Sequence, residues 1–176
     1  MKLPLIAFFV LVCCAFATVD LKPVDSDDAV KFSIKNFGIG TGGELKGLRG
    51  LIKWDAANPA ASSINVSVDV STINTGIDSR DNHLKKEEYF NVAKYPVISF
   101  VSESVSAENG SLQATGNITI KGVSKRITIP FTVSASDNGY LFSGNFTVNR
   151  RDFGVGGGSM VLGDEVKIAL KVKANP

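Results

Sequence analysis

Cysteine is almost absent from this chain. The two that it has, Cys13 and Cys14, both precede residue 18. A chain cleaved after residue 17 would therefore carry no thiol at all. This excludes a disulfide framework, a cysteine-ligated metal and a cysteine nucleophile from the remainder of the protein.

Histidine is equally scarce, since His83 is the single one. A tight transition-metal site needs several nitrogen or sulfur ligands, so we expect no metal. A hydrolase that pairs His83 with a nearby carboxylate of Asp78, Asp81 or Glu87 remains an alternative, but the sequence shows no nucleophile for it. We favour a partly exposed His83 that hydrogen-bonds the rim of the fold, and we expect no enzymatic activity.

An excess of one charge is also missing. Lysine and arginine number 19 against 17 aspartates and glutamates, which gives a formal net charge of +2. Such a chain has no long-range electrostatic reason to bind nucleic acid or an anionic surface. We therefore expect no nucleic-acid partner.

Only one long hydrophobic run is present, from Leu5 to Ala17, and it follows the positive charge of Lys2. The run ends in Ala15-Phe16-Ala17, the small-x-small pattern of a signal-peptidase site. It is too short for a span of about 20 residues. We expect residues 1–17 to be a cleaved signal peptide, residues 18–176 to form one domain, and the protein to be periplasmic or secreted. A lipoprotein anchor on one of the two cysteines is the weaker alternative.

What the chain has in abundance is period-two alternation of apolar and polar residues. This pattern is typical of antiparallel strands with one buried and one solvated face. One segment, Asp78 to Glu88, has a helical pattern instead. Alternation alone leaves open whether the sheet is a closed barrel or a β-sandwich. The clearest alternating segments are Val30–Ile34, Ile64–Val70, Ile127–Val133, Tyr140–Val148 and Val166–Val172.

Several short motifs follow one another along the chain in a characteristic order. They are Ser71-x-Ile73-x-Thr75-Gly76, Arg80-Asp81-x-His83-Leu84, Tyr89-Phe90, Tyr95-Pro96-x-Ile98-x-Phe100, Gly116-x-Ile118-Thr119-Ile120-x-Gly122-Val123 and Asn149-Arg150-x-Asp152-Phe153-Gly154. Their order resembles that of the YceI-like family. The resemblance implies an eight-stranded antiparallel, lipocalin-like barrel with a short helical excursion near residues 78–88. It also implies that a polyisoprenoid chain or related amphiphile is held inside the barrel, and that the protein forms homodimers.

The inward side chains of such a barrel either fill its core or line a slot for an apolar ligand, and periodicity does not distinguish the two. The resemblance favours the slot. We therefore predict a lipid-binding cavity for a polyisoprenoid or an isoprenoid quinone, with no other cofactor. Its predicted lining is Phe32, Ile34, Trp54, Val66, Val68, Leu84, Phe90, Ile98, Phe100, Ile118, Phe131, Phe142, Phe146 and Val148.

Charged residues near the predicted mouth are candidates for binding a polar head group, because arginine offers paired donors to phosphate or carboxylate. These are Arg80, Asp81, His83, Arg150 and Asp152. The alternative is structural: ion pairs of Arg80 with Asp152, or of Asp81 with Arg150, would fasten the excursion to the barrel. Leu84, Tyr89, Phe90 and the glycine-rich segment Gly154–Gly158 are candidate gate elements.

Two functions of different classes follow. The first is sequestration or transport of a long apolar lipid, with only transient membrane contact for exchange. The second is an adhesion or scaffolding module, a β-sandwich with a filled core and no ligand. The presence or absence of a cavity separates them.

Overall fold

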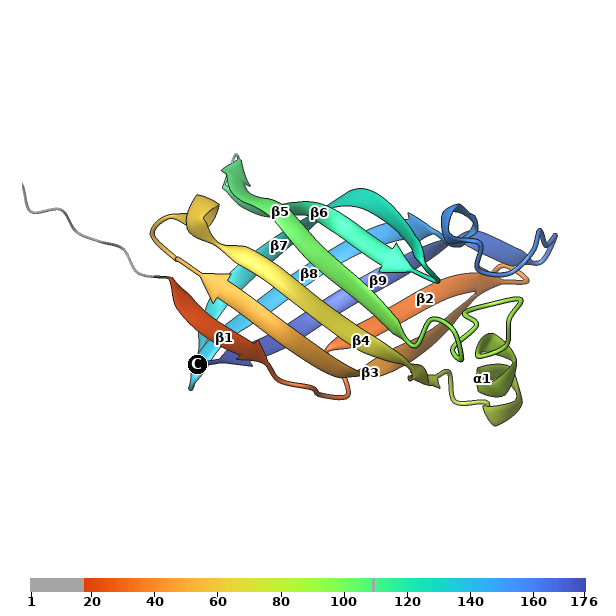
Figure 1. Ribbon diagram of the computed structural model, residues 1–176. Helices are drawn as coiled ribbons and strands as arrows, with labels where there is room; N and C mark the ends of the chain where they lie inside the picture. The colour runs from red at the N-terminus through yellow and green to blue at the C-terminus, as the bar shows by residue number, and fades with distance from the viewer. Residues whose placement is uncertain (1–17, 109) are drawn as a thin grey trace, which may run out of the picture.

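The computed structural model describes residues 18–108 and 110–176, and these form a twisted antiparallel sheet with one short α-helix (Figure 1). The predicted signal peptide lies outside the described residues. The strands are β1 (Val19–Pro23), β2 (Val30–Asn36), β3 (Ile39–Trp54), β4 (Ser63–Asn74), β5 (Val97–Glu108), β6 (Ser111–Ile120), β7 (Val123–Ser136), β8 (Gly139–Asn149) and β9 (Leu162–Asn175).

The sheet closes on itself, because β3 pairs with β4 as well as with β2. β1 and β2 lie one after the other between β3 and β9: β1 pairs with Ile52–Trp54 and β2 with the first part of β3. They therefore act as one interrupted ribbon, and the nine strands make an eight-stranded barrel. The barrel prediction is confirmed. A closed barrel has no second sheet to pack against, so the sandwich alternative is wrong.

The alternation in the sequence sets which side chains face inward. On β8, Phe142, Gly144 and Val148 are buried, while Asn145 and Thr147 between them are exposed. The register places Phe142 opposite Val172 and Phe146 opposite Ile168, so the inward residues of neighbouring strands form continuous rows. This follows from the period of two, which directs alternate side chains to opposite faces of a strand.

One end of the barrel is packed solid. Leu21 and Ala174 are fully buried there, and Trp54 packs edge-on against Phe131 and Phe142 with ring centroids 6.2 and 5.6 Å away. The short strand β1 lies at this end. Its pairing with both β3 and β9 completes the barrel wall there.

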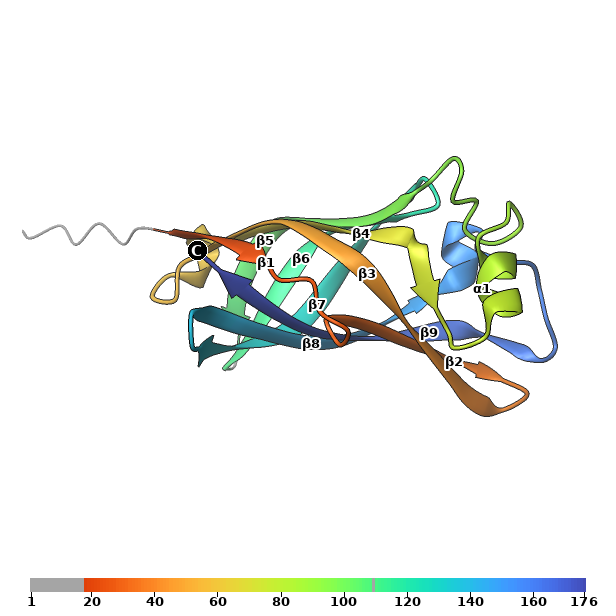
Figure 2. The ribbon, with the colours of Figure 1, turned by 90° about the horizontal axis from the view of Figure 1, so that it is seen from below.

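The helical excursion lies at the opposite end, beside the β2–β3 hairpin and the loop between β8 and β9 (Figure 2). The helix α1 (Asp78–Leu84) is shorter than the segment predicted to be helical, which ran to Glu88. From Lys85 the chain continues in turns, with Tyr89 N–H donating to Lys86 O and Asn91 N–H to Lys86 O. Two 3-10 turns, Pro59–Ala61 and Arg150–Phe153, complete the described fold.

Candidate functional site

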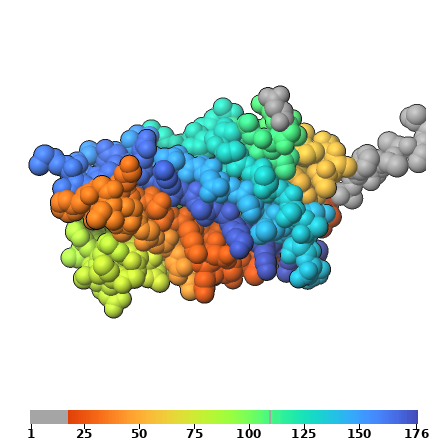
Figure 3. All heavy atoms as spheres, turned by 180° about the vertical axis from the view of Figure 1, so that it is seen from behind, coloured from red at the N-terminus to blue at the C-terminus, as the bar shows by residue number. Residues whose placement is uncertain are grey.

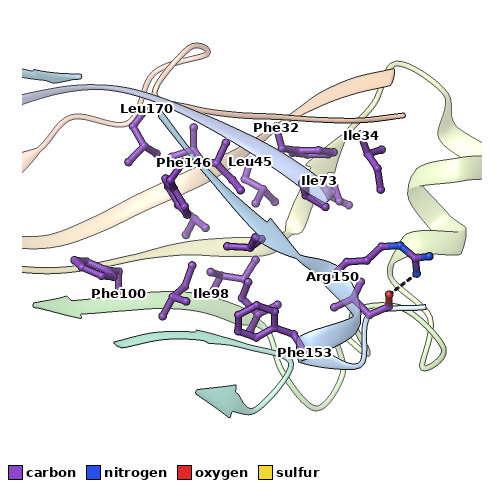
Figure 4. Close-up of a pocket in the computed structure, with 18 of the residues that line it drawn as sticks. Phe32, Ile34, Leu45, Ile73, Ile98, Phe100, Phe146, Arg150, Phe153 and Leu170 are labelled. Carbon is purple, nitrogen blue, oxygen red and sulfur yellow. Dashed lines mark hydrogen bonds between the residues drawn. The ribbon is translucent and has the colours of Figure 1, made fainter. Parts of the chain in front are cut away.

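The barrel encloses a cavity of about 510 Å³ that is lined mainly by apolar side chains (Figure 4). Phe131 and Phe142 lie on its floor, directly above Trp54. At the other end the lining includes exposed residues, among them His83 and Ser159. The cavity therefore opens to solvent at the end that carries α1. Its volume falls within the range of roughly 300–1,000 Å³ typical of ligand pockets.

The inward side chains at the open half of the barrel do not meet in the middle. Phe32, Ile98, Phe146 and Leu170 all point inward, yet each is only half-buried. In a filled core these side chains would be sealed from solvent, as Leu21 and Trp54 are at the closed end. The interior is thus solid at one end and hollow at the other.

Thirteen of the fourteen side chains predicted for the lining do line the cavity. The exception is Trp54, which lies beneath the floor, because it is near the end of β3 at the closed end of the barrel. Contact of the thirteen with a ligand stays a prediction. They are Phe32, Ile34, Val66, Val68, Leu84, Phe90, Ile98, Phe100, Ile118, Phe131, Phe142, Phe146 and Val148.

Sequence reasoning missed further lining residues, and two pairs of them show why. Ile168 and Leu170 on β9 belong to an alternation that is plain in the sequence, and only their role was overlooked. Leu45 and Leu48 on β3 had no such signal. Bulges occur in the β3–β4 pairing between Glu44 and Arg49, and Gly47 has a φ of 72°, so the inward positions there depart from a strict period of two.

Two polar side chains of the helical excursion fold back onto Thr75 at the cavity mouth. Arg80 donates from Nε to Thr75 Oγ1 and from Nη2 to Thr75 O, both at 2.7 Å. Asp81 is buried and accepts hydrogen bonds from the N–H (3.0 Å) and the hydroxyl of the same Thr75. Arg80 lines the cavity and Asp81 does not. In the described part of the chain, Arg80 forms no ion pair.

Arg150 is only 4% exposed and organises the loop between β8 and β9. Its guanidinium donates to the carbonyl oxygens of Val155 (2.9 Å), Gly157 (3.0 Å) and Gly163 (2.9 Å), and to the carboxylate of Asp164 (2.8 Å). A flat fork of five donors fits such a ring of acceptors.

The suggested ion pairs across elements are therefore wrong. Arg150 pairs with Asp164 instead of Asp81, because the β8–β9 loop and the start of β9 bring carbonyl and carboxylate oxygens around the guanidinium. Asp152 is exposed, does not line the cavity and bonds neither arginine. Arg80 reaches Thr75 five residues before it, so the excursion is fastened locally.

We predict that Arg150→Lys destabilises the fold by about 1–3 kcal/mol, since a single ammonium cannot satisfy acceptors placed around a fork. Arg151→Lys is the matched control: Arg151 is the exposed neighbour on the same 3-10 turn, and we expect a change below about 0.5 kcal/mol. Chemical unfolding measures both. Equal stability of the two variants would show that the fork of Arg150 is dispensable.

His83 and the following turn form the rim beside this loop. His83 Nε2 lies 3.0 Å from Glu88 Oε1, and its ring packs edge-on against Tyr89 with a centroid distance of 4.9 Å. The pKa of Glu88 is lowered, first by its own backbone N–H and then by His83. His83 thus pairs with Glu88 and with none of the three carboxylates considered from the sequence.

The gate candidate Gly154–Gly158 is hydrogen-bonded to Glu88, just before the gate candidate Tyr89, and to Lys121. Gly156 N–H donates to Glu88 O at 2.9 Å, and Lys121 Nζ donates to Gly154 O at 2.7 Å. A Cβ on Gly156, whose φ is 69°, would lie 2.8 Å from the Tyr89 ring. The glycine therefore permits close contact between the loop and the turn. A gating movement stays a prediction.

Residues 18–108 and 110–176 contain no group of three or more side chains arranged to hold a metal. Within the same ranges, no helix is long and apolar enough to cross a membrane.

Several known proteins are similar to this chain in sequence. A UPF0312 protein of Pseudomonas paraeruginosa is 32% identical over 154 residues, which cover 82% of this chain and 79% of that protein. The protein YceI of Salmonella arizonae is 38% identical over 101 residues, 57% of this chain and 53% of that protein.

Solved structures share the barrel. BcnA of Burkholderia cenocepacia superposes with a TM-score of 0.77 at 28% identity, covering 81% of this chain and 93% of that one. A polyisoprenoid-binding domain from Saccharophagus degradans superposes with a TM-score of 0.70 over 88% of this chain and 97% of that one. At 14% identity, that likeness concerns the fold alone. The model of the YceI-like domain matches residues 21–174, nearly the whole described fold. The chain belongs to the YceI-like family.

Proposed function

We propose that this protein sequesters or carries a long-chain apolar lipid, of the polyisoprenoid or isoprenoid-quinone class, inside its barrel. The observation that carries the proposal is the apolar cavity of about 510 Å³ with one open end. The S. degradans domain supports it, since that polyisoprenoid-binding domain shares the fold. The protein would perform no covalent chemistry.

The physics of binding is then mainly the transfer of hydrocarbon out of water. Each buried methylene contributes roughly 0.8 kcal/mol before losses. Ordering the chain removes much of this, and large ligands keep about 0.3 kcal/mol per heavy atom. At that rate about 20 enclosed carbons would contribute about 6 kcal/mol, and a tail with about 40 carbons all in contact with the protein would reach about 12 kcal/mol, which corresponds to nanomolar affinity. The tail supplies the affinity, and the rim need only orient the head group.

Arg80 is the best-placed donor for a head group. It lines the cavity, and its Nη1 has no hydrogen-bond partner in the described part of the chain. We predict that Arg80→Ala weakens binding of an isoprenoid phosphate about tenfold and leaves binding of the matching alcohol unchanged. It should also cost about 1–2 kcal/mol of stability, because the two hydrogen bonds to Thr75 are lost.

Arg80→Lys is the control, because lysine keeps the positive charge but lacks the planar guanidinium with its paired donors. We expect an intermediate affinity for the phosphate. Titrations with both lipids and thermal unfolding separate the two roles. Lower stability with unchanged affinity for the phosphate would leave Arg80 a purely structural residue.

The direct test of the function is mass spectrometry of organic extracts from freshly purified protein. A long-chain lipid at about one per barrel is the expected result. An empty extract, together with no uptake of an added isoprenoid alcohol, would overturn the proposal. The location is part of the proposal: with residues 1–17 as a signal peptide, binding would occur in the periplasm or outside the cell.

A further inference from the structure

Four apolar side chains project from the open end of the barrel and pack against little of the protein. Phe37 and Ile39, on the β2–β3 hairpin, are 73% and 71% exposed. Met160 and Val161 lie on the loop between β8 and β9; Met160 is fully exposed and Val161 is 40% exposed. We call these four residues the apolar tip.

The apolar tip is one surface at the mouth of the cavity. Phe37 N–H donates to Val161 O at 2.8 Å, which joins the hairpin to the loop. Figure 3 shows the two segments side by side at one end of the molecule, the hairpin in orange and the loop in blue. Residues next to the tip in sequence, Asn36 and Ser159, line the cavity, as does Val161 itself. A surface that covers the apolar tip therefore also faces the open end of the cavity.

Phe37 adopts a backbone conformation that phenylalanine disfavours. The hairpin has a two-residue turn between the paired Asn36 and Ile39, with φ of 50° at Phe37 and 76° at Gly38. Two positive φ angles are typical of a type I′ turn, where asparagine or aspartate usually precedes the glycine. An exposed, strained aromatic residue contributes nothing to folding. Such a departure from local rules is characteristic of functional surfaces.

The size of the tip argues against a stable protein partner. At about 200 Å² for a fully exposed side chain, the exposed fractions of the four side chains together offer less than the roughly 800 Å² per partner of a standard interface. The flanking charges are of both signs, with Lys35 and Glu44 on the hairpin and Arg151 and Asp164 beside the loop. Projecting apolar side chains with balanced charge around them suit shallow insertion into a lipid bilayer.

We propose that the apolar tip inserts into the surface of a lipid bilayer and holds the cavity mouth against the membrane. This rests on the proposed function, because it gives the route by which an apolar lipid would pass between membrane and barrel without crossing water. The attraction is hydrophobic, so a zwitterionic bilayer suffices. Binding should change little with salt, because no charged cluster drives it.

The test is co-sedimentation of the full chain with phosphatidylcholine vesicles. We expect Phe37→Asn combined with Ile39→Thr to lower vesicle partitioning at least about tenfold, since two inserted side chains are lost. Asparagine accepts a positive φ, so Phe37→Asn alone should melt at the same or a higher temperature while binding vesicles less well. Val101→Ser is the matched control: Val101 is 47% exposed on the wall strand β5, and its replacement should leave partitioning unchanged.

Three results would overturn the docking proposal. These are no binding of the unaltered protein to the vesicles, equal binding by the double variant, and a concentration-dependent dimer that only the double variant loses. The last would make the tip a contact between copies of the chain. Lipid content of the purified unaltered protein, measured by mass spectrometry, separates this proposal from the proposed function. Bound lipid in the unaltered protein with tip-dependent vesicle binding supports both, and an empty unaltered barrel with tip-dependent vesicle binding supports docking alone.

Discussion

Replacing Leu170 with tryptophan is expected to weaken lipid binding about a hundredfold and to leave the stability of the barrel nearly unchanged. Leu170 points into the hollow half of the interior and is only half-buried (Figure 4). The larger indole would displace about four tail methylenes, each worth roughly 0.8 kcal/mol. That loss of about 3 kcal/mol corresponds to more than a hundredfold in affinity.

Stability is the second readout of this experiment. In a filled core, an added indole would cost about 1–3 kcal/mol by overpacking. In a hollow barrel it enters existing space. Ala169→Trp is the control, because Ala169 is the next residue of β9 and faces outward. Titration with a fluorescent fatty acid and chemical unfolding measure both quantities. A strongly destabilised Leu170→Trp, or one that binds lipid as well as Ala169→Trp, would contradict the cavity.

Trp54→Ala is expected to destabilise the protein by about 3–5 kcal/mol, the usual cost of removing a buried aromatic side chain. Trp54 is buried at the closed end and packs edge-on against Phe131, Tyr140 and Phe142, with centroids 5.6 to 6.5 Å away. These rings support the floor of the cavity. For a domain of this size, the melting temperature should fall by on the order of 10 °C.

Trp54→Phe is the matched control. The indole N–H has no hydrogen-bond partner in the described residues, so phenylalanine removes packing area and no hydrogen bond. We expect a smaller loss, about 1–2 kcal/mol, with lipid binding retained. Thermal unfolding of both variants, each with and without lipid, gives the measurement. A loss below about 1 kcal/mol for Trp54→Ala would mean that the closed end is not a packed core.

Most of the barrel and its lining could be predicted, because the alternation of apolar and polar residues along each strand is a local property of the sequence. Phe142, Phe146 and Val148 alternate with polar residues, and each faces the interior as expected. Alternation does not indicate whether the sheet closes into a barrel. The resemblance to the YceI-like family predicted that it does. It also placed the helical excursion, predicted over Asp78–Glu88 and found as a helix over Asp78–Leu84, near the mouth.

The polar contacts at the mouth could not be predicted, because they depend on loop geometry. Nothing in the sequence spacing indicates that the carbonyl oxygens of Val155, Gly157 and Gly163 surround Arg150. In the same way, Asp81 and Arg80 both turn back to Thr75, so neither reaches across to the β8–β9 loop. Charge alone suggested ion pairs between the helical excursion and the β8–β9 loop. The folded chain instead brings other partners next to these charged side chains.

The sequence by itself determined which face of each strand is apolar, since a period of two directs alternate side chains to opposite sides of a sheet. Only the tertiary structure decided that the apolar faces meet around Trp54 at one end and stay apart around Leu170 at the other. The physical reason is that filling depends on the distance across the closed barrel and on side chains from strands far apart in the chain. Neither of these is encoded in the alternation of any one strand.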